Sequence, residues 1–289
     1  MAWMSAHFYS MSLGMQTSAQ VLLPEPDQGI GVTGAVWDGK TELPVLYLLH
    51  GKSDDSTIWL RRTSVERYNA GRQLAIVMPE AFRSFYADQK FGYKYYTYLT
   101  EELPEIMNRF FRISNAREKS FISGLSMGGY GCMLAGLRAP EKYCKVASQS
   151  GLLASDGFEA FEAFKKIKEP GALTQLERDD PFTAGVVLDQ VLSFGTYQEY
   201  AESDYNLSGL LKRRVAEGAK LPELMISVGT EDFLYESNQL FCKQLDELKV
   251  PYTYFEEPGM HEWAVWDRQI QRVLDWVAPR TVEQEGPTR

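Results

Sequence analysis

The stretch "KSFISGLSMGGYGCMLAG", residues 119–136, joins a predicted buried strand to a predicted helix. At its centre Gly124, Ser126 and Gly128 form the pattern G-x-S-x-G, in the strand–turn–helix context that a nucleophile elbow requires. The glycines permit a tight turn. Unpaired N–H groups at a helix start favour developing negative charge beside the serine. Ser126 is therefore the candidate nucleophile, and the alternative is an ordinary helix cap.

A serine nucleophile needs a base and an orienting acid, which in this topology follow it in the order acid, then histidine. Of the three histidines only His261 follows Ser126, in the loop "EEPGMHEW" between the last predicted strand and the last predicted helix. The acid is expected after the strand "LMISVG", where Glu231 and Asp232 are the candidates. Asp232 is preferred. A capping or packing role is the alternative for both Asp232 and His261.

The tetrahedral intermediate of such a reaction needs two N–H donors. One is expected from Met127, the residue after the nucleophile. The other is expected from the loop after the strand "PVLYLLH" (44–50), where Gly51 permits close approach and the next amide belongs to Lys52. His50 ends that strand, and we expect it to shape the loop rather than to act as a base.

The alternation of strand and helix patterns predicts an α/β fold, with a mostly parallel central sheet and helices on both faces. Near-continuous apolar runs predict strands buried on both faces. These runs are 44–50, 73–79, 119–124 and 223–229, with a more polar candidate at 252–257 and two early, antiparallel strands within 6–23. Helical spacing recurs at 57–71, 98–111, 232–249 and 261–277. Pro104 is expected to kink or split the second of these helices.

Residues 152–222 interrupt this alternation, because they contain helical patterns but no clear buried strand. They predict a small helical insertion over the sheet edge within a single domain, 1–289. The polar tail, 279–289, is expected to be frayed.

The composition excludes several classes of function. The formal net charge is −9 and the pI is near 5.0, and such a surface disfavours nucleic-acid and anionic membrane partners. No apolar run approaches the ~18 residues of a membrane helix. Nucleotide-binding and metal-ligand motifs are absent from the sequence, so we expect no cofactor and no metal. Three cysteines without CxxC spacing, and an N-terminus unlike a signal peptide, indicate a cytoplasmic location.

Together these residues resemble the esterase D family of α/β-hydrolases, especially its tributyrin esterase branch. The matching stretches are "PVLYLLHG", "IWLRRTSVERY", "FGYKYYTYLTEELPEIMNRFF", "EKSFISGLSMGGYGC", "GTEDFLYESN" and "PGMHEWAVWD". The resemblance implies a serine carboxylesterase that hydrolyses small acetyl to butyryl esters through an acyl-enzyme. It supports Ser126, Asp232 and His261 as the triad. An acyltransferase, or a feruloyl or acetylxylan esterase, is the alternative. Edge strands and the habit of the family favour a homo-oligomer.

The chain also departs from its relatives. Its loop "HGKSDDST" lacks the cysteine usual in formylglutathione hydrolases, which argues against that substrate. Asp54 stands where close relatives often have glycine. With Asp55 it could place negative charge near the entrance, but a solvated turn is the preferred interpretation of both residues. Tyr86 is expected to face the site, because similar esterases carry a tyrosine there. Trp263 either lines the pocket or packs the last helix.

Overall fold

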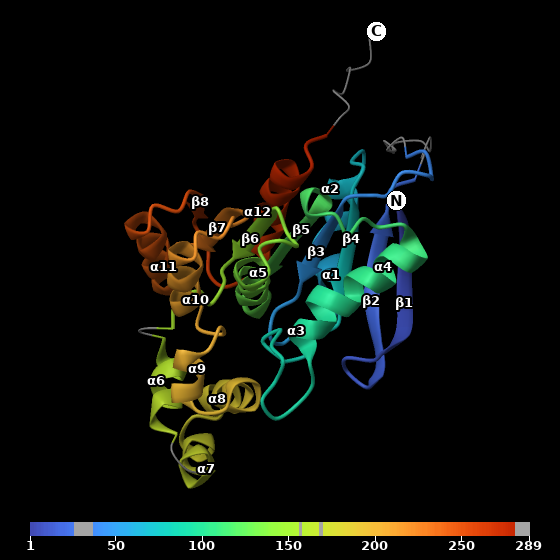
Figure 1. Cartoon of the computed structure of the whole chain (residues 1–289). Coiled ribbons are helices and arrows are strands. Elements are labelled where there is room, and N and C mark those ends of the chain that lie inside the picture. Colours follow the sequence, from blue (N-terminus) through green and yellow to red (C-terminus); the bar gives the residue numbers. More distant parts are fainter. Residues whose placement is uncertain (26–36, 156–157, 168–169, 281–289) are drawn as a thin grey trace.

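Eight strands form one sheet in the computed structural model, which describes residues 1–25, 37–155, 158–167 and 170–280 (Figure 1). In spatial order they are β1 (Ala2–Ser10), β2 (Met15–Leu23), β4 (Ala75–Pro79), β3 (Val45–Leu49), β5 (Ser120–Leu125), β6 (Lys145–Gln149), β7 (Glu223–Gly229) and β8 (Tyr252–Glu257). β2 runs antiparallel to both β1 and β4, and every other adjacent pair is parallel. The prediction of a mostly parallel sheet is confirmed.

One strand, β6, was not predicted from the sequence. It begins with a lysine and ends with Ser148 and Gln149, so no apolar run marks it. β6 is nevertheless paired on both sides, with β5 and β7. The Gln149 carbonyl at its end accepts a hydrogen bond of 2.9 Å from the Ser126 amide. The missed strand therefore supports the turn that carries the candidate nucleophile.

Helices cover both faces of this sheet (Figure 1). One face packs against α1 (Ile58–Arg62), α2 (Val65–Asn69) and α12 (Trp263–Val277). The other packs against α3 (Tyr95–Thr97), α4 (Leu103–Phe111), α5 (Met127–Arg138) and α11 (Tyr235–Glu247). Strand β3 shows why its apolar run is continuous: Tyr47 belongs to the core on the α5 side, whereas Leu46 and Leu48 belong to the core on the α12 side. A strand with helices on both sides needs apolar residues at successive positions.

The predicted helix at 98–111 changes its type before Pro104. A π-helical segment, Tyr98–Glu102, leads into α4, and Pro104 lies in the first turn of α4. Proline lacks a backbone N–H, and the first turn of a helix is where that donor is not needed. The helix is therefore not split at Pro104: it changes from π to α type just before the proline, and Leu103 and Met107 are buried in the core.

The segment 152–222 is helical wherever it forms regular structure in its described residues. Its helices are α6 (Glu159–Lys166), α7 (Pro170–Asp179), α8 (Pro181–Phe194), α9 (Tyr197–Glu202) and α10 (Leu207–Ala216). Helix α8 reaches the loops that follow β3 and β4, where Asp189 forms ion pairs with Lys52 and Arg83. That the chain is one domain stays a prediction. The predicted frayed tail lies outside the described residues from position 281 onward.

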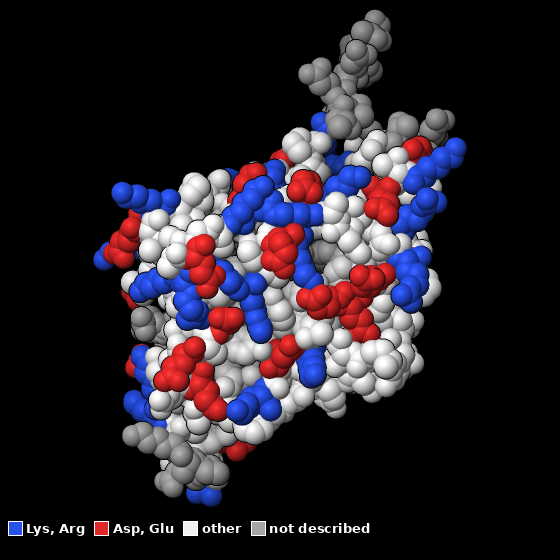
Figure 2. Space-filling model, in the orientation of Figure 1, with Lys and Arg blue, Asp and Glu red and all other residues white. Residues whose placement is uncertain are grey.

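The surface carries both signs of charge despite the negative net charge. Figure 2 shows Lys and Arg side chains interspersed with Asp and Glu over the face in view, with no broad patch of one sign. Within the described ranges, no helix is both long and apolar enough to cross a membrane.

Candidate active site

Ser126 lies in the sharp turn between β5 and α5. Its φ of 53° and ψ of −117° belong to a region that non-glycine residues rarely adopt. A Cβ atom on Gly124 would lie 2.5 Å from the carbonyl group of Gly128, and one on Gly128 would lie 2.6 Å from the Leu49 carbonyl oxygen. Both glycines are thus needed for α5 to begin this close to β3 and β5, which is the physical reason for the G-x-S-x-G spacing.

The three residues predicted as a triad form one hydrogen-bonded chain. His261 Nε2 lies 2.9 Å from Ser126 Oγ, and His261 Nδ1 lies 3.0 Å and 2.9 Å from the two carboxylate oxygens of Asp232. The Asp232 side chain is fully buried and also accepts a hydrogen bond from the Leu234 amide. Because a carboxylate can only accept, Nδ1 carries the imidazole proton and Nε2 is left to accept the serine proton.

Glu231, the alternative acid, makes a different contact. Its carboxylate accepts a hydrogen bond from the Gly259 amide, and this bond lowers the pKa of Glu231 below its ordinary value. The contact ties the loop after β7 to the loop that leads to His261. Of the two acids, Asp232 is therefore the one bonded to the imidazole.

Two aromatic side chains that the sequence analysis did not single out pack against the His261 ring. The Phe233 ring centroid lies 4.4 Å from that of His261, and the Trp266 centroid lies 4.8 Å away at 86°. The Trp266 indole N–H donates to Ser150 Oγ. Phe233 is 60% exposed, so it forms part of the rim beside the imidazole. Its position next to Asp232 in the sequence was the available clue.

The two amides predicted as oxyanion donors have no hydrogen-bond acceptor in the part of the chain that the structure describes. Met127 is the first residue of α5 and has no acceptor one turn earlier in the helix. Over the described residues, neither the Met127 amide nor the Lys52 amide donates a hydrogen bond to the chain. Both N–H groups therefore remain available to a ligand.

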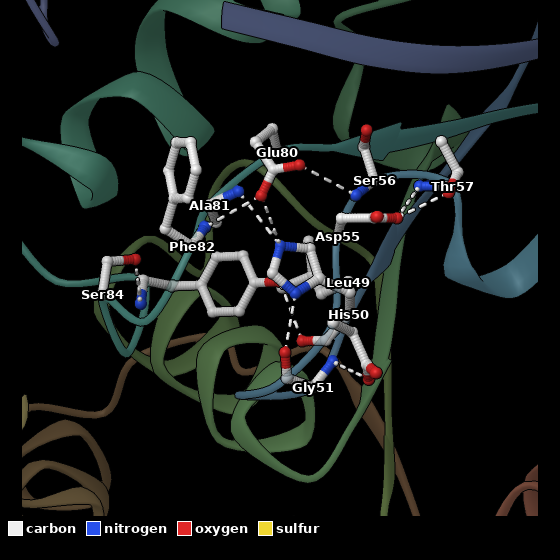
Figure 3. Close-up of polar contacts among 12 residues, drawn as sticks. Leu49, His50, Gly51, Asp55, Ser56, Thr57, Glu80, Ala81, Phe82 and Ser84 are labelled. Atoms are coloured by element: carbon white, nitrogen blue, oxygen red, sulfur yellow. Dashed lines mark hydrogen bonds and ion pairs between the residues drawn. The ribbon is translucent and has the colours of Figure 1, made fainter. Parts of the chain in front are cut away.

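A buried network around His50 orients the loop that carries Lys52 (Figure 3). His50 Nδ1 donates to the Gly51 carbonyl oxygen at 2.7 Å, and His50 Nε2 accepts from the Ala81 amide at 3.0 Å. In a trans peptide the C=O and the following N–H point in opposite directions. Holding the Gly51 carbonyl therefore directs the Lys52 N–H away from the His50 ring, which agrees with the predicted loop-shaping role.

Glu80 lies on the far side of this imidazole. Its Oε1 lies 3.5 Å from His50 Nε2, and its two oxygens accept hydrogen bonds from the Ser56 and Phe82 amides. Burial opposes ionisation of Glu80, but hydrogen bonds from the Ser56 and Phe82 amides favour the charged form, and the pKa of Glu80 is lowered. Glu80 thus links the ends of β3 and β4 through an ionised group that sequence reasoning missed.

Tyr86 was expected to face the site, but its side chain is buried. Its hydroxyl donates to the His50 carbonyl oxygen at 3.0 Å, and the residue is only 1% exposed. A ring that solvent does not reach offers little surface to a substrate. Tyr86 instead packs behind the loop that carries Lys52, where it holds the end of β3.

Trp263 lies within an aromatic cluster at the start of α12. Its ring meets those of Trp59 and Trp266 edge to face, with centroids 5.3 Å and 5.2 Å apart. This arrangement favours the packing alternative for Trp263. The tryptophan that contacts the imidazole is Trp266, one helical turn further along.

Helix α8 contacts the same loop through a buried carboxylate. Asp189 lies 2.9 Å from Lys52 Nζ and 2.8 Å from the Arg83 guanidinium, and its side chain is 7% exposed. Burial lowers the pKa of Lys52, and the contact with Asp189 partly offsets that effect. The insertion is thereby joined to a residue whose backbone amide is a candidate oxyanion donor.

Comparison with known proteins places the chain in a family. The model of the family described as "Putative esterase" matches residues 10–277. A relative named acetyl esterase, from Caldicellulosiruptor saccharolyticus, is 26% identical over 292 residues, covering 96% of this chain and 98% of the relative.

Solved structures agree with this assignment. The substrate-bound, fluorophosphonate-binding serine hydrolase FphF of Staphylococcus aureus matches with a TM-score of 0.78 and 30% identity, over 96% of this chain and 98% of its own. The S-formylglutathione hydrolase FrmB of the same organism matches with a TM-score of 0.75 and 30% identity, over the same shares of the two chains. The chain therefore belongs to the Putative esterase family and is a carboxylic ester hydrolase with the α/β-hydrolase fold.

Proposed function

We propose that the chain is a serine carboxylesterase that hydrolyses short acyl esters, acetyl to butyryl, through an acyl-enzyme on Ser126. The observation that carries this proposal is the continuous hydrogen-bonded chain from Asp232 through His261 to Ser126. The name of the curated relative, acetyl esterase, supports an acetyl substrate.

In the proposed mechanism His261 accepts the Ser126 hydroxyl proton as Oγ attacks the ester carbonyl. The carbonyl oxygen gains negative charge, which the amides of Lys52 and Met127 stabilise together with the N-terminus of α5. His261 then gives its proton to the leaving alcohol, and an acyl-enzyme remains. A water molecule repeats the sequence, releases the acid and restores Ser126. Asp232 holds the imidazole in one tautomer and stabilises its protonated form.

A second candidate substrate is S-formylglutathione. The likeness to FrmB favours it, whereas the loop after β3, "HGKSDDST", contains no cysteine. A formyl thioester and an acetyl oxoester would both present an acyl carbonyl to the same serine. They differ in the acyl group, which carries hydrogen or methyl, and in the thiol or alcohol that the other side of the pocket accepts.

The experiment that tests the proposal is labelling with a fluorophosphonate, followed by identification of the modified residue by mass spectrometry. We expect a single label on Ser126, loss of p-nitrophenyl acetate hydrolysis in step with labelling, and no label in Ser126→Ala. S-Formylglutathione, tested with the same enzyme, measures the second candidate. Added methanol separates hydrolysis from acyl transfer by the ratio of acid to methyl ester. Full activity in Ser126→Ala would falsify the proposal.

We also propose that the protein is a cytoplasmic homo-oligomer. Its three cysteines are free, as is usual in a reducing compartment. Strand β1 is an edge of the sheet, contains no Lys, Arg, Asp or Glu, and exposes Trp3 and Tyr9 by more than half. Such an edge lacks the charged residues that commonly prevent pairing with another strand. Light scattering coupled to gel filtration measures the mass, and a monomer would contradict the oligomer.

A further inference from the structure

Three charged side chains follow Gly51 in the loop after β3, and two of them are neutralised by ion pairs. Lys52 Nζ lies 2.9 Å from Asp189. Asp55 bonds to Thr57 and lies 3.1 Å from the Arg61 guanidinium. The third, Asp54, forms no ion pair with any described residue.

The Asp54 carboxylate lies close to the candidate nucleophile. Its Oδ2 accepts a hydrogen bond of 3.1 Å from the Gly51 amide. A Cβ atom built on Gly51 would lie 2.7 Å from that oxygen and 3.7 Å from Ser126 Cβ. The sum of these two distances is the upper limit of the separation between the Asp54 oxygen and Ser126 Cβ. An ester bound to Ser126 would therefore lie within a few ångströms of this carboxylate.

The environment of Asp54 strengthens its effect on a neighbouring charge. The side chain is half-buried, and no described residue donates a hydrogen bond to its other carboxylate oxygen. Burial raises the pKa of Asp54, against the opposing effects of His50, the Gly51 amide and Arg61, while Asp55 adds to the rise. A partly desolvated charge interacts more strongly across a few ångströms than a fully hydrated one.

We propose that Asp54 selects the substrate by charge, favouring esters that carry a positive group and disfavouring esters that carry a negative one. The inference rests on the esterase function proposed above. Of the nearby cations, Arg61 is paired with Asp55, Lys52 is paired with Asp189, and Arg83, which shares the Asp189 carboxylate, is 53% exposed and screened by solvent. None of the three cancels the charge beside Ser126.

The two aspartates of the loop differ in this respect. Asp55 fits the solvated turn that the sequence allowed, because its carboxylate caps Thr57 and meets Arg61 at the surface. Asp54 folds back onto the Gly51 amide and toward the serine. Asp55→Asn is therefore a matched control for Asp54→Asn, since it removes the same charge from the adjacent position. In Asp54→Asn the new side-chain amide oxygen can still accept the Gly51 N–H, so the loop contact is preserved.

The experiment compares kcat/KM for two pairs of esters, each of which sets a charged ester against an uncharged one of the same chain length. Acetylcholine against 3,3-dimethylbutyl acetate places a positive charge on the alcohol side. Monomethyl succinate against methyl butyrate places a negative charge on the acyl side. In Asp54→Asn we expect the charged-to-neutral ratio to fall for acetylcholine or to rise for monomethyl succinate, by on the order of tenfold. The pair that responds identifies the side of the ester that Asp54 faces. Asp55→Asn should leave both ratios within about twofold of those of the unmodified protein, because solvent screens a surface charge.

Three results would overturn the inference. Both ratios could stay unchanged in Asp54→Asn, all four esters could lose activity by one common factor, or Asp55→Asn could match Asp54→Asn. An equal loss of activity toward all four esters would mean that Asp54 only shapes the loop. Failure of the unmodified protein to hydrolyse either neutral ester would instead contradict the proposed function, so the two failures are distinguishable.

Discussion

At the residue scale, Ser126 has a backbone conformation that non-glycine residues rarely adopt. A non-glycine residue at φ 53° and ψ −117° costs about 1–3 kcal/mol, which the surrounding packing must offset. That packing includes the close approach of Gly124 and Gly128 and the hydrogen bond from the Ser126 amide to the Gln149 carbonyl. The strain keeps Oγ at the tip of the turn, within hydrogen-bond reach of His261.

This strain predicts that Ser126→Gly and Ser126→Ala change the free energy of unfolding by different amounts. Ser126→Gly relieves the positive φ, whereas Ser126→Ala keeps the Cβ atom and its strain. We expect the glycine variant to be more stable than the alanine variant by about 1 kcal/mol, although glycine usually costs about 0.5–1 kcal/mol of chain entropy. Urea denaturation of both inactive variants measures the difference. An alanine variant of equal or greater stability would argue against a strained elbow.

Substitutions at the two adjacent acids, Asp232 and Glu231, should lower kcat by very different factors. Ser126→Ala and His261→Ala should each reduce kcat by several orders of magnitude, and Asp232→Asn by about ten-thousand-fold, because Asn stabilises the wrong imidazole tautomer. Glu231→Gln is the matched control, since Glu231 bonds to the Gly259 amide rather than to His261. Steady-state kinetics with one acetyl ester measures kcat for each variant. A larger loss of kcat in Glu231→Gln than in Asp232→Asn would identify Glu231 as the acid of the triad.

Asp54 should make the free energy of unfolding depend on pH. Burial raises its pKa in the folded protein, so the folded state binds its proton more tightly than the unfolded chain does. The group therefore begins to destabilise the fold as pH rises through its ordinary pKa, and the full effect is present above the raised pKa. Asp54→Asn removes this penalty. We expect its stability relative to the unmodified protein to increase as the pH rises above the ordinary pKa of an aspartate, and to stay constant once the pH exceeds the raised pKa. A difference that does not change with pH would contradict the assignment.

The catalytic candidates could be predicted from the sequence because each one is tied to a local pattern or to chain order. Ser126 lies in a G-x-S-x-G turn, and His261 is the single histidine after it. Glu80 and Asp189 carry no such pattern, because their roles depend on contacts with His50 and Lys52 that only the fold creates. Tyr86 was placed by resemblance, which does not indicate the direction of its ring.

At the scale of elements, helix α8 and the loop after β3 are joined by an ion pair through one carboxylate. Asp189 belongs to the insertion, and Lys52 contributes the amide that we propose as an oxyanion donor. An ion pair this well buried fixes both partners, and removing one partner leaves the other charge unpaired. The insertion can therefore influence catalysis without touching the substrate.

We expect Asp189→Asn to lower kcat by about tenfold with a smaller change in KM, because a misplaced oxyanion donor weakens the transition state more than the bound ester. Glu199→Gln is the control. Glu199 also joins the insertion to the loop after β4, by an ion pair with Lys90, but both side chains are about half exposed. Steady-state kinetics of Asp189→Asn and Glu199→Gln measures the change in kcat and KM for each. Equal effects would mean that Asp189 acts only by holding the insertion in place.

Elements with long apolar runs were predictable, and those whose burial comes from pairing were not. β3 and β4 are apolar at successive positions, and β5 and β7 are mostly so with serines between, because helices cover both of their faces. β6 has Lys145, Ser148 and Gln149 among its five residues, yet it lies between two strands that bury it. The Gln149 side-chain amide donates a hydrogen bond to the Ser123 hydroxyl of β5, and a single sequence does not reveal such a partner.

The whole molecule brings together residues that are far apart in the sequence because its strands are parallel. The loop with Lys52 follows β3, Ser126 follows β5, Asp232 follows β7 and His261 follows β8. Parallel strands place their carboxyl ends at one edge of the sheet, so all four residues meet there. Helix α8 extends over the same edge, which puts the insertion beside the substrate rather than on a remote face.

The packing of the insertion onto this edge predicts a short acyl pocket. The rings of Phe85, Tyr130 and Phe194 meet pairwise with centroids 5.8 Å, 5.4 Å and 6.2 Å apart, and the first two are buried at 3% and 2% exposure. Aromatic side chains thus fill the space between α8 and α5, and we infer that the acyl chain points toward this space, where the rings leave little room for a long chain. In an open apolar groove each further methylene would gain up to about 0.8 kcal/mol, or about fourfold in binding. We therefore expect kcat/KM for p-nitrophenyl esters, measured from C2 to C12 below their micellar concentrations, to peak between acetyl and butyryl and then to fall. Carbons beyond the pocket would displace the carbonyl from the amides of Lys52 and Met127, so the fall should be in kcat more than in KM. A steady rise to C12 would contradict the short pocket and favour a long-chain lipase or acyltransferase.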